Sequence, residues 1–277
     1  KGIQLLNIIF SIEYKELIIG GWDSFPLWMA AFFSLKSKNA IVLESSYLES
    51  NTTGIIGFFK SFFIKRINKV YASGVSQKKL ALSLNFKGRV IITNGVGIFN
   101  FIPQPKYKKV RKVYKFLYVG RLSKEKNLTY LIKTFDKLKH LELNIIGFGP
   151  QEKELKELSK NITNVKLLGS IKNKELSNYY QESHVFILPS ISEPWGLVVE
   201  EALNNGIPVI VSDRVGCANE IVLENENGII FTLNDSNSLS KALVKMTDNI
   251  FYNKLRLNIS RMDYTEIALK QVECYLN

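Results

Sequence analysis

Short apolar runs alternate with longer amphipathic stretches along most of this chain. Short runs bounded by polar turns are typical of buried strands, and the amphipathic stretches have the period of helices that cover a sheet. The expected strands are residues 16–20, 40–43, 70–72, 90–92, 115–120, 143–146, 165–168, 185–188, 209–211 and 228–231. The expected helices are 26–36, 54–67, 77–84, 128–139, 151–160, 174–182, 197–204 and 238–246. This alternation predicts an α/β protein with parallel sheets.

The alternation is interrupted at residues 99–112, which carry two prolines and no hydrophobic period. A chain of 277 residues also suits two domains better than one. We therefore expect a first domain over residues 1–100, a linker over 101–112 and a second domain over 113–262. A C-terminal helix over 263–277 could return to the first domain.

Positive charge is concentrated in the first part of the chain. Residues 1–115 hold 18 Lys or Arg and five acidic residues, a net charge of +13, while the remainder carries −1. This asymmetry predicts an anionic partner for the first domain. Nucleic acid is one candidate, but no helix-turn-helix, zinc-finger or RNP signature accompanies the charge, so we expect none to bind.

The amino-acid composition indicates the class of protein and the cellular compartment that suits it. Apolar residues make up 46% of the chain and charged residues 22%, which is typical of a globular protein. Two cysteines, Cys217 and Cys274, form no disulfide framework and fit a reducing cytoplasm. The mostly apolar run at 27–35 is far shorter than the roughly 20 residues that a membrane span needs. Because the chain begins with Lys1, a preceding signal could have been lost.

The segment 192–203 carries the most chemical information. A polar loop with Glu193 is followed by a Pro-Trp-Gly turn and by a helical pattern that contains Glu201. The start of such a helix presents unpaired N–H groups and attracts anions. A carboxylate accepts hydrogen bonds from sugar hydroxyls but cannot hold a phosphate. Together these features predict a ligand that is part phosphate and part polyol, namely a sugar nucleotide.

The wording of residues 189–202, Pro-Ser-x-x-Glu-Pro-Trp-Gly-Leu-Val-x-Glu-Glu-Ala, resembles the E-x7-E motif of retaining group 1 (family 4) glycosyltransferases. The bare pair of glutamates means little, since Glu201 could equally be a solvated helix residue. The resemblance implies the GT-B architecture, in which two Rossmann-like domains face each other across a cleft. Because no strand, Gly-rich loop and helix open this chain, the first domain is expected to be incomplete.

Two cations follow the strand at 115–120. Arg121 comes directly after it, and Lys126 lies five residues further on, just before a helix. Parallel sheets bind ligands at these strand ends, although a solvated basic loop is the alternative. The string Gly-Arg-Leu…Glu-Lys-Asn resembles the family motif whose Arg and Lys neutralise the donor diphosphate. The resemblance implies that role for Arg121 and Lys126, contact with donor sugar hydroxyls for Glu193, and contact with the ribose for Glu201.

The remaining donor-site predictions rest on backbone. Gly147-Phe148-Gly149-Pro150 resembles the family's Gly-x-Gly-Pro, with Phe148 where an acid is more usual; a tight strand-to-helix turn is the alternative. Gly169-Ser170-Ile171 resembles the loop whose backbone reads the base. The predicted donor-binding set also includes Gly120, at the end of the strand at 115–120, and Gly196, Leu197 and Val198, at the start of the helix at 197–204. The full set is Gly120, Arg121, Lys126, Gly147, Gly149, Ser170, Ile171, Glu193, Gly196, Leu197, Val198 and Glu201, with Glu193, Arg121 and Lys126 as the catalytic residues.

We expect neither a metal nor a cofactor. The chain contains no Asp-x-Asp motif, which many other transferases use to hold a divalent ion. The departing nucleoside diphosphate gains negative charge as the glycosidic bond breaks. Two basic side chains and a helix start near Gly196 would stabilise that charge without a metal.

The first domain departs from the family pattern. Ser73–Ser76 and Thr93–Gly97 resemble its landmarks, with Gly97 where Asp is usual. Many members place a first-domain histidine near the anomeric carbon, but the histidines here, His140 and His184, belong to the second domain and are expected to be structural. Glu44, which follows a predicted strand, is a candidate replacement.

The helix predicted at 54–67 brings Phe58, Phe59, Phe62 and Phe63 onto one arc. An ordinary core helix is one interpretation. The net charge of +13 favours the other, peripheral attachment to an anionic membrane by apolar insertion and electrostatic attraction. Such attachment would suit a lipid-linked acceptor.

The resemblance implies a glycosyltransferase that moves a sugar from a nucleotide-diphosphate sugar to an acceptor hydroxyl with retention of configuration. The resemblance implies a glycan or lipid-linked acceptor, a role in surface polysaccharide or glycolipid synthesis, and a cytoplasmic location or one on the inner membrane face. A GT-B sugar-nucleotide epimerase and a non-catalytic nucleotide-sugar-binding protein remain alternatives. A Rossmann dehydrogenase is disfavoured, because no Gly-x-Gly-x-x-Gly follows a strand.

Overall fold

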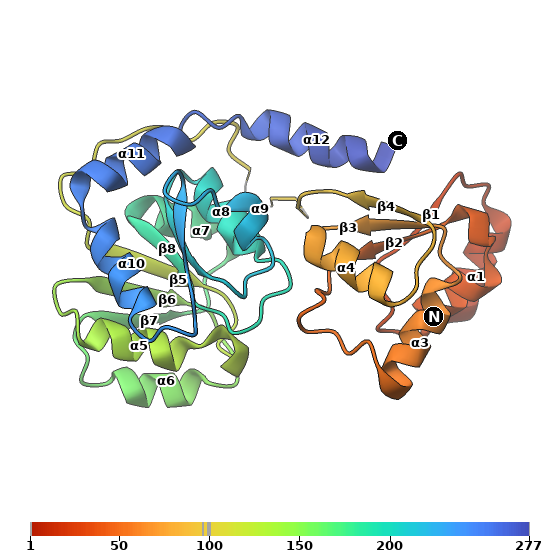
Figure 1. Cartoon of the computed structure of the whole chain (residues 1–277), viewed down its shortest axis with the longest axis horizontal. Helices are drawn as coiled ribbons and strands as arrows, with labels where there is room; N and C mark the ends of the chain where they lie inside the picture. Colours follow the sequence, from red (N-terminus) through yellow and green to blue (C-terminus); the bar gives the residue numbers. More distant parts are fainter. Residues whose placement is uncertain (1, 96, 99–100, 277) are drawn as a thin grey trace. The chain divides into compact units, whose positions relative to one another are not determined.

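The computed structural model describes residues 2–95, 97–98 and 101–276 (Figure 1). Val96 of the first-domain landmark and Phe99 and Asn100 before the expected linker lie outside these residues. The chain divides into two compact units, which are called unit 1 (residues 1–96 and 269–277) and unit 2 (residues 97–268).

Unit 1 is built on a four-stranded parallel sheet in the order β1-β2-β3-β4. Its strands are β1 (Leu17–Ile19), β2 (Asn39–Leu43), β3 (Lys69–Ala72) and β4 (Arg89–Ile92), and its helices are α1 (Gly2–Ser11), α2 (Phe25–Phe33), the 3-10 turn η1 (Lys36–Lys38), α3 (Gly54–Ile64) and α4 (Val75–Ser83). The core gathers buried strand residues such as Ile41 and Val70 against Phe63 of α3.

The last helix, α12 (Tyr264–Leu276), ends in unit 1. Tyr275 stacks on Tyr71 of β3 with ring centroids 4.5 Å apart. The Gln271 side chain donates a hydrogen bond of 2.9 Å to the carbonyl of Asn94. These contacts attach α12 to β3 and to the loop that follows β4.

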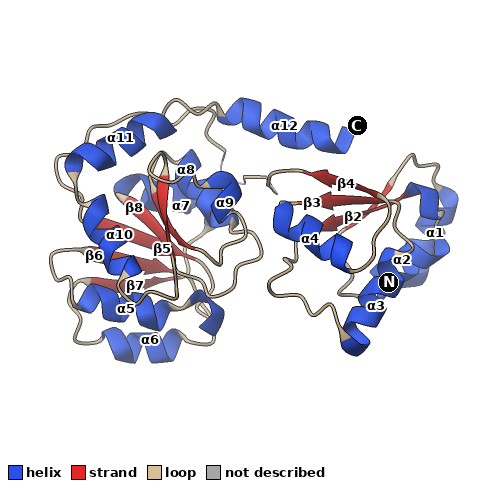
Figure 2. Cartoon of the chain, viewed as in Figure 1, coloured by secondary structure: helices blue, strands red, loops and turns tan. Residues whose placement is uncertain are grey.

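Unit 2 contains a six-stranded parallel sheet in the order β10-β9-β8-β5-β6-β7, with helices on both faces (Figure 2). The strands are β5 (Lys115–Val119), β6 (Glu142–Ile146), β7 (Val165–Gly169), β8 (Val185–Leu188), β9 (Val209–Ser212) and β10 (Gly228–Phe231). The helices are η2 (Lys124–Lys126), α5 (Leu128–Asp136), α6 (Glu152–Ser159), α7 (Asn173–Glu182), α8 (Leu197–Asn204), α9 (Ala218–Ile221), α10 (Ser238–Met246) and α11 (Asn249–Ile259).

The chain order of unit 2 reverses between β5 and β8. Successive strands are added on one side from β5 to β7 and on the other from β8 to β10. In open parallel sheets the crevice at such a switch point, beyond the carboxyl ends of the strands, is where ligands bind. The loops after β5 and β8 are the ones that carry Arg121, Lys126 and Glu193.

The predicted α/β class and parallel sheets are confirmed, and each predicted strand is present within a residue or two of its expected bounds. Among the described residues, the α-helices α1, α9 and α11 and the 3-10 turns η1 and η2 were not predicted. Pro150 is not the first residue of a helix, because α6 begins at Glu152.

Candidate donor-binding site

The loops after β5 and β6 are pressed together beside the switch point. A Cβ at Gly147 would lie 1.8 Å from the carbonyl oxygen of Gly120, and one at Gly149 would lie 2.5 Å from that of Leu122. The Leu122 amide donates to the Phe148 carbonyl at 2.9 Å. The two glycines are therefore required first of all for the contact between these loops.

A pocket of about 350 Å³ opens beside this contact. Five predicted donor-site residues line it, drawn from the loops after β5, β6 and β7. They are Gly120, Arg121, Gly147, Ser170 and Ile171. Phe148 lines it too and is 67% exposed. The other predicted donor-site residues are not among the lining residues, namely Lys126, Gly149, Glu193, Gly196, Leu197, Val198 and Glu201. An aromatic ring at the mouth of a pocket of this size suits a planar base.

Lys126 and Glu193 form an ion pair with 2.5 Å between Nζ and Oε2, and each side chain is 14% exposed. Lys126 closes η2, and Asn127 with φ of 58° then turns the chain into α5. Glu193 lies in the loop after β8. Its backbone amide donates a hydrogen bond to the Arg214 carbonyl, and its carbonyl accepts one from the Gly216 amide. The Ser190 hydroxyl approaches the same carboxylate oxygen at 3.4 Å.

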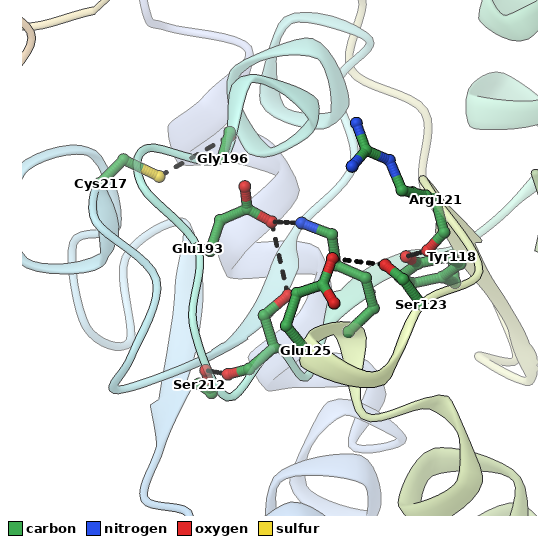
Figure 3. Close-up of polar contacts among 10 residues, drawn as sticks. Tyr118, Arg121, Ser123, Glu125, Glu193, Gly196, Ser212 and Cys217 are labelled. Carbon is green, nitrogen blue, oxygen red and sulfur yellow. Dashed lines mark hydrogen bonds and ion pairs between the residues drawn. The ribbon is translucent and has the colours of Figure 1, made fainter. Parts of the chain in front are cut away.

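Arg121 is exposed, in contrast to Lys126. The Tyr118 hydroxyl donates to the Arg121 carbonyl at 2.8 Å and so anchors the backbone of its loop. No ion pair of the guanidinium is found among the residues that the structure describes. Figure 3 shows Arg121 and Glu193 extending from different loops of unit 2, with the short contacts of Ser123 and Ser212 below them.

The start of α8 depends on glycine. Gly196 has φ of +102°, and a Cβ there would meet Val215 Cγ1 at 2.9 Å. The preceding Trp195 is buried, and its indole N–H donates to Glu200 at 2.5 Å. This bond fixes the Pro-Trp-Gly turn, so that the first residues of α8, Leu197 and Val198, present their backbone amides at the carboxyl end of the sheet.

Glu201 is buried and is not a solvated helix residue, so that alternative is wrong. The Tyr180 hydroxyl on α7 donates to its Oε2 at 3.1 Å. Burial raises the pKa of the Glu201 carboxyl, and the bond from Tyr180 offsets part of the rise by lowering that pKa. Tyr180 was not predicted, because nothing in the spacing of two residues 21 apart marks them as partners.

The two histidines lie apart from these loops. His184 precedes β8, and its Nδ1 accepts hydrogen bonds from the amides of Tyr114 and Lys115 at 3.1 and 3.0 Å. Burial lowers its pKa to about 4. His140 is exposed after α5. In unit 1, Glu44 follows β2 and lines a smaller pocket of about 190 Å³ with Asp23 and Trp22.

A metal site and a membrane span would each leave a recognisable feature in the structure. Over 2–95, 97–98 and 101–276, no group of three or more His, Cys, Asp and Glu side chains could hold a metal ion. In the described part of the chain, no helix is both long and apolar enough to cross a bilayer. That activity needs no metal stays a prediction.

Comparison with known proteins decides the family. A family model described as "Glycosyl transferases group 1" matches residues 102–262, which is more than half of the chain. The chain belongs to this family. The matched region contains all the donor-site residues predicted above.

Relatives support the same assignment. The chain is 38% identical over 112 residues to sulfoquinovosyl transferase SQD2 of Arabidopsis thaliana, covering 40% of this chain and 22% of that protein. It is 32% identical over 189 residues to the UDP-Gal:alpha-D-GlcNAc-diphosphoundecaprenol alpha-1,3-galactosyltransferase of Escherichia coli, covering 61% and 47%. The chain thus spans less than half the length of either curated relative.

Solved structures confirm the GT-B fold. The apo form of the lipopolysaccharide outer core galactosyltransferase WaaB matches with a TM-score of 0.73 at 16% identity, over 99% of this chain and 78% of that one. At this identity the likeness concerns the fold alone.

Proposed function

We propose that this protein is a retaining glycosyltransferase of family 4 that moves a sugar from a nucleotide-diphosphate sugar to an acceptor hydroxyl. The observation that carries the proposal is the gathering of Arg121, Lys126 and Glu193 with the start of α8 at the switch point of unit 2. Cations and helix amides suit a diphosphate, and carboxylates suit sugar and ribose hydroxyls.

We assign a task to each group. Breaking the bond between the anomeric carbon and the diphosphate oxygen leaves negative charge on the departing group. Arg121, Lys126 and the amides at the start of α8 stabilise that charge most at the moment it develops. Glu193 accepts hydrogen bonds from the sugar, and Glu201 accepts them from the ribose. The acceptor oxygen then bonds to the anomeric carbon on the face that the diphosphate leaves, and its proton passes to the departing phosphate oxygen.

We further propose a UDP sugar as donor and a lipid-diphosphate-linked glycan as acceptor, in surface polysaccharide or glycolipid synthesis without a metal. The name of the Escherichia coli relative contains both UDP-Gal and a diphosphoundecaprenol-linked GlcNAc. The pocket beside Phe148 supports a planar base, and the basic first 115 residues support an anionic acceptor.

Product analysis tests the reaction. The protein is incubated with UDP-galactose, UDP-glucose or UDP-N-acetylglucosamine and a short polyprenyl-diphosphate-linked N-acetylglucosamine, with and without EDTA. We expect a new disaccharide with the anomeric configuration of the donor sugar, observed by NMR, in equal yield with EDTA. An altered free sugar nucleotide would instead indicate an epimerase, and donor binding without product a non-catalytic binding protein.

We also propose that α3 attaches the protein to an anionic membrane on the inner face. Phe63 is fully buried, but most of the other large apolar side chains of this helix are exposed. They are Ile55 (77%), Ile56 (54%), Phe58 (67%), Phe59 (51%) and Phe62 (47%). The core-helix interpretation therefore accounts for only one edge of α3. Neither α1, α2 nor α3 contains an acidic residue, so nothing on them repels anionic lipid.

Vesicle sedimentation tests this attachment. Because each inserted Phe contributes about 1.5–3 kcal/mol, the double variant Phe58→Ser/Phe62→Ser should bind phosphatidylglycerol vesicles at least about tenfold more weakly than wild type. Leu82→Ser, at an exposed leucine on α4, is the matched control. Failure of wild type to bind would contradict the proposal. A dimer in solution that the double variant abolishes would assign the face to a second copy instead.

A further inference from the structure

The ion pair between Lys126 and Glu193 joins two groups that the proposed function gives to different parts of one substrate. Lys126 is assigned to the diphosphate and Glu193 to the sugar. In the structure they are bonded to each other, 2.5 Å apart and each 14% exposed. The pair is thus mostly shielded from solvent. The attraction between opposite charges is screened less at such a site than at an exposed one.

The two roles compete for the same ammonium group. A diphosphate and the Glu193 carboxylate are both anions, and each is stabilised by direct contact with Lys126 Nζ. Arg121 has no such competitor among the described residues, so it is available to a diphosphate at all times. Ser190 gives Glu193 only a long contact of 3.4 Å, which makes Lys126 its main partner.

We propose that Glu193 competes with the bound diphosphate for Lys126, and that re-formation of this ion pair promotes release of the nucleoside diphosphate product. The inference rests on the proposed function. While the sugar is attached, its hydroxyls supply hydrogen bonds to Glu193, which leaves Lys126 to the diphosphate. Once the sugar has been transferred, Glu193 loses those partners and returns to Lys126. The site therefore favours the donor over the product.

Two simpler roles for Glu193 predict different behaviour. If Glu193 only held Lys126 in its binding orientation, removing its charge would weaken the binding of a nucleoside diphosphate. If its charge only repelled the diphosphate through space, removing it would strengthen binding whether or not Lys126 were present. Competition requires both that binding becomes stronger and that this gain depends on Lys126.

A double-mutant cycle on UDP affinity separates these roles. UDP is titrated calorimetrically into wild type, Glu193→Gln, Lys126→Gln and the double variant. We expect Glu193→Gln to lower the Kd for UDP by at least roughly twofold, because even exposed ion pairs contribute up to about 1 kcal/mol and this pair is mostly shielded. In the Lys126→Gln background the same change should have no effect. Glu125→Gln, which removes an equal charge from η2, is the matched control and should alter the Kd less than twofold.

The outcomes are distinct. Weaker or unchanged UDP binding by Glu193→Gln would overturn the inference, and so would a gain that persists without Lys126. Circular dichroism of each variant checks folding, and Glu193→Ala repeats the test if Glu193→Gln is unfolded. If wild type binds UDP and Arg121→Ala does not, the donor site stands even when the inference fails. If wild type binds no nucleoside diphosphate, both fail.

Discussion

At the scale of single residues, Tyr180 and Glu201 show how a hydroxyl donor favours the ionised form of a buried carboxyl group. The carboxylate lies inside unit 2 with one hydroxyl donor, and burial raises its pKa. A buried carboxylate must be ionised to accept hydrogen bonds from two ribose hydroxyls. Tyr180 favours the ionised form, since a donor to the carboxylate stabilises its charge.

Tyr180→Phe should therefore shift the pH dependence of UDP binding. Without the hydroxyl, the pKa of Glu201 rises further, so the loss of affinity on acidification should begin at a higher pH than in wild type. At a pH at which Glu201 is ionised in both proteins, their affinities for UDP should converge. UDP Kd is measured across pH for both proteins and for Ser177→Ala, a control on α7 whose hydroxyl bonds Asn205 instead. Coincident pH profiles would refute this role of Tyr180.

His184 makes stability depend on pH. Burial holds its folded pKa at about 4, below its ordinary value of 6.5. The unfolded chain therefore takes up this proton first, and stability is lost as pH falls from about 6.5 towards 4. We expect urea unfolding of wild type to lose up to about 2 kcal/mol from this group over that window. His184→Asn should reduce this pH dependence, whereas His140→Asn, at the exposed histidine, should not. Equal slopes for all three proteins would contradict the assignment.

At the scale of elements, glycines decide how closely the loops of unit 2 approach. Gly147→Ala would place a Cβ against the Gly120 carbonyl, so we expect a loss of about 3 kcal/mol or more in the free energy of unfolding, with loss of UDP binding. Gly169→Ala is the matched control. Its φ is +74°, but its Cβ would meet nothing within 4 Å, so strain of about 1 kcal/mol is expected. Urea unfolding of both variants measures the difference; equal losses would show that the loop contact is not tight.

Most of the strands and helices could be predicted from the sequence. Apolar runs marked each strand, and the Pro-Trp-Gly turn marked the start of α8 at Leu197. The helices α1, α9 and α11 were missed. For α11 a start signal was present and was overlooked, because Asp248 caps this helix by accepting hydrogen bonds from the amides of Ile250 and Phe251. The arc of phenylalanines on α3 was recognised, but its division into buried Phe63 and exposed Phe58 and Phe62 depends on what packs against the helix.

The clustering of some predicted site residues could be foreseen from the sequence, but their contacts could not. Arg121, Ser170 and Ile171 are brought to one pocket as expected from strands that end at the same sheet edge. The pairing of Lys126 with Glu193 joins residues 67 apart, and the burial of Glu201 depends on α7. Such contacts are set by packing between elements, which a pattern along the chain does not contain.

At the scale of the whole molecule, both units are basic, with a net charge of +7 on unit 1 and +5 on unit 2. The net charge of +13 over the first 115 residues therefore includes six cations at the start of unit 2, the unit that also holds the residues that suit a nucleotide. If the first part attracts anionic lipid, vesicle binding should weaken steeply as salt rises, because exposed charges are screened within about 10 Å at 0.1 M salt. UDP affinity should change much less in the same series. Vesicle binding that is insensitive to salt would show that charge contributes little to it.

The central claim is that unit 2 binds the diphosphate of a nucleotide sugar through Arg121. The most direct test is calorimetric titration of UDP, and then of GDP, into wild type and Arg121→Ala in the presence of EDTA. Lys124→Ala, at the exposed neighbouring lysine of η2, is the matched control. A charge-assisted contact contributes about 1.5–3 kcal/mol, so Arg121→Ala should weaken binding by roughly 10- to 150-fold and Lys124→Ala only slightly. Absence of binding by folded wild type, or equal affinity of wild type and Arg121→Ala, would contradict the account.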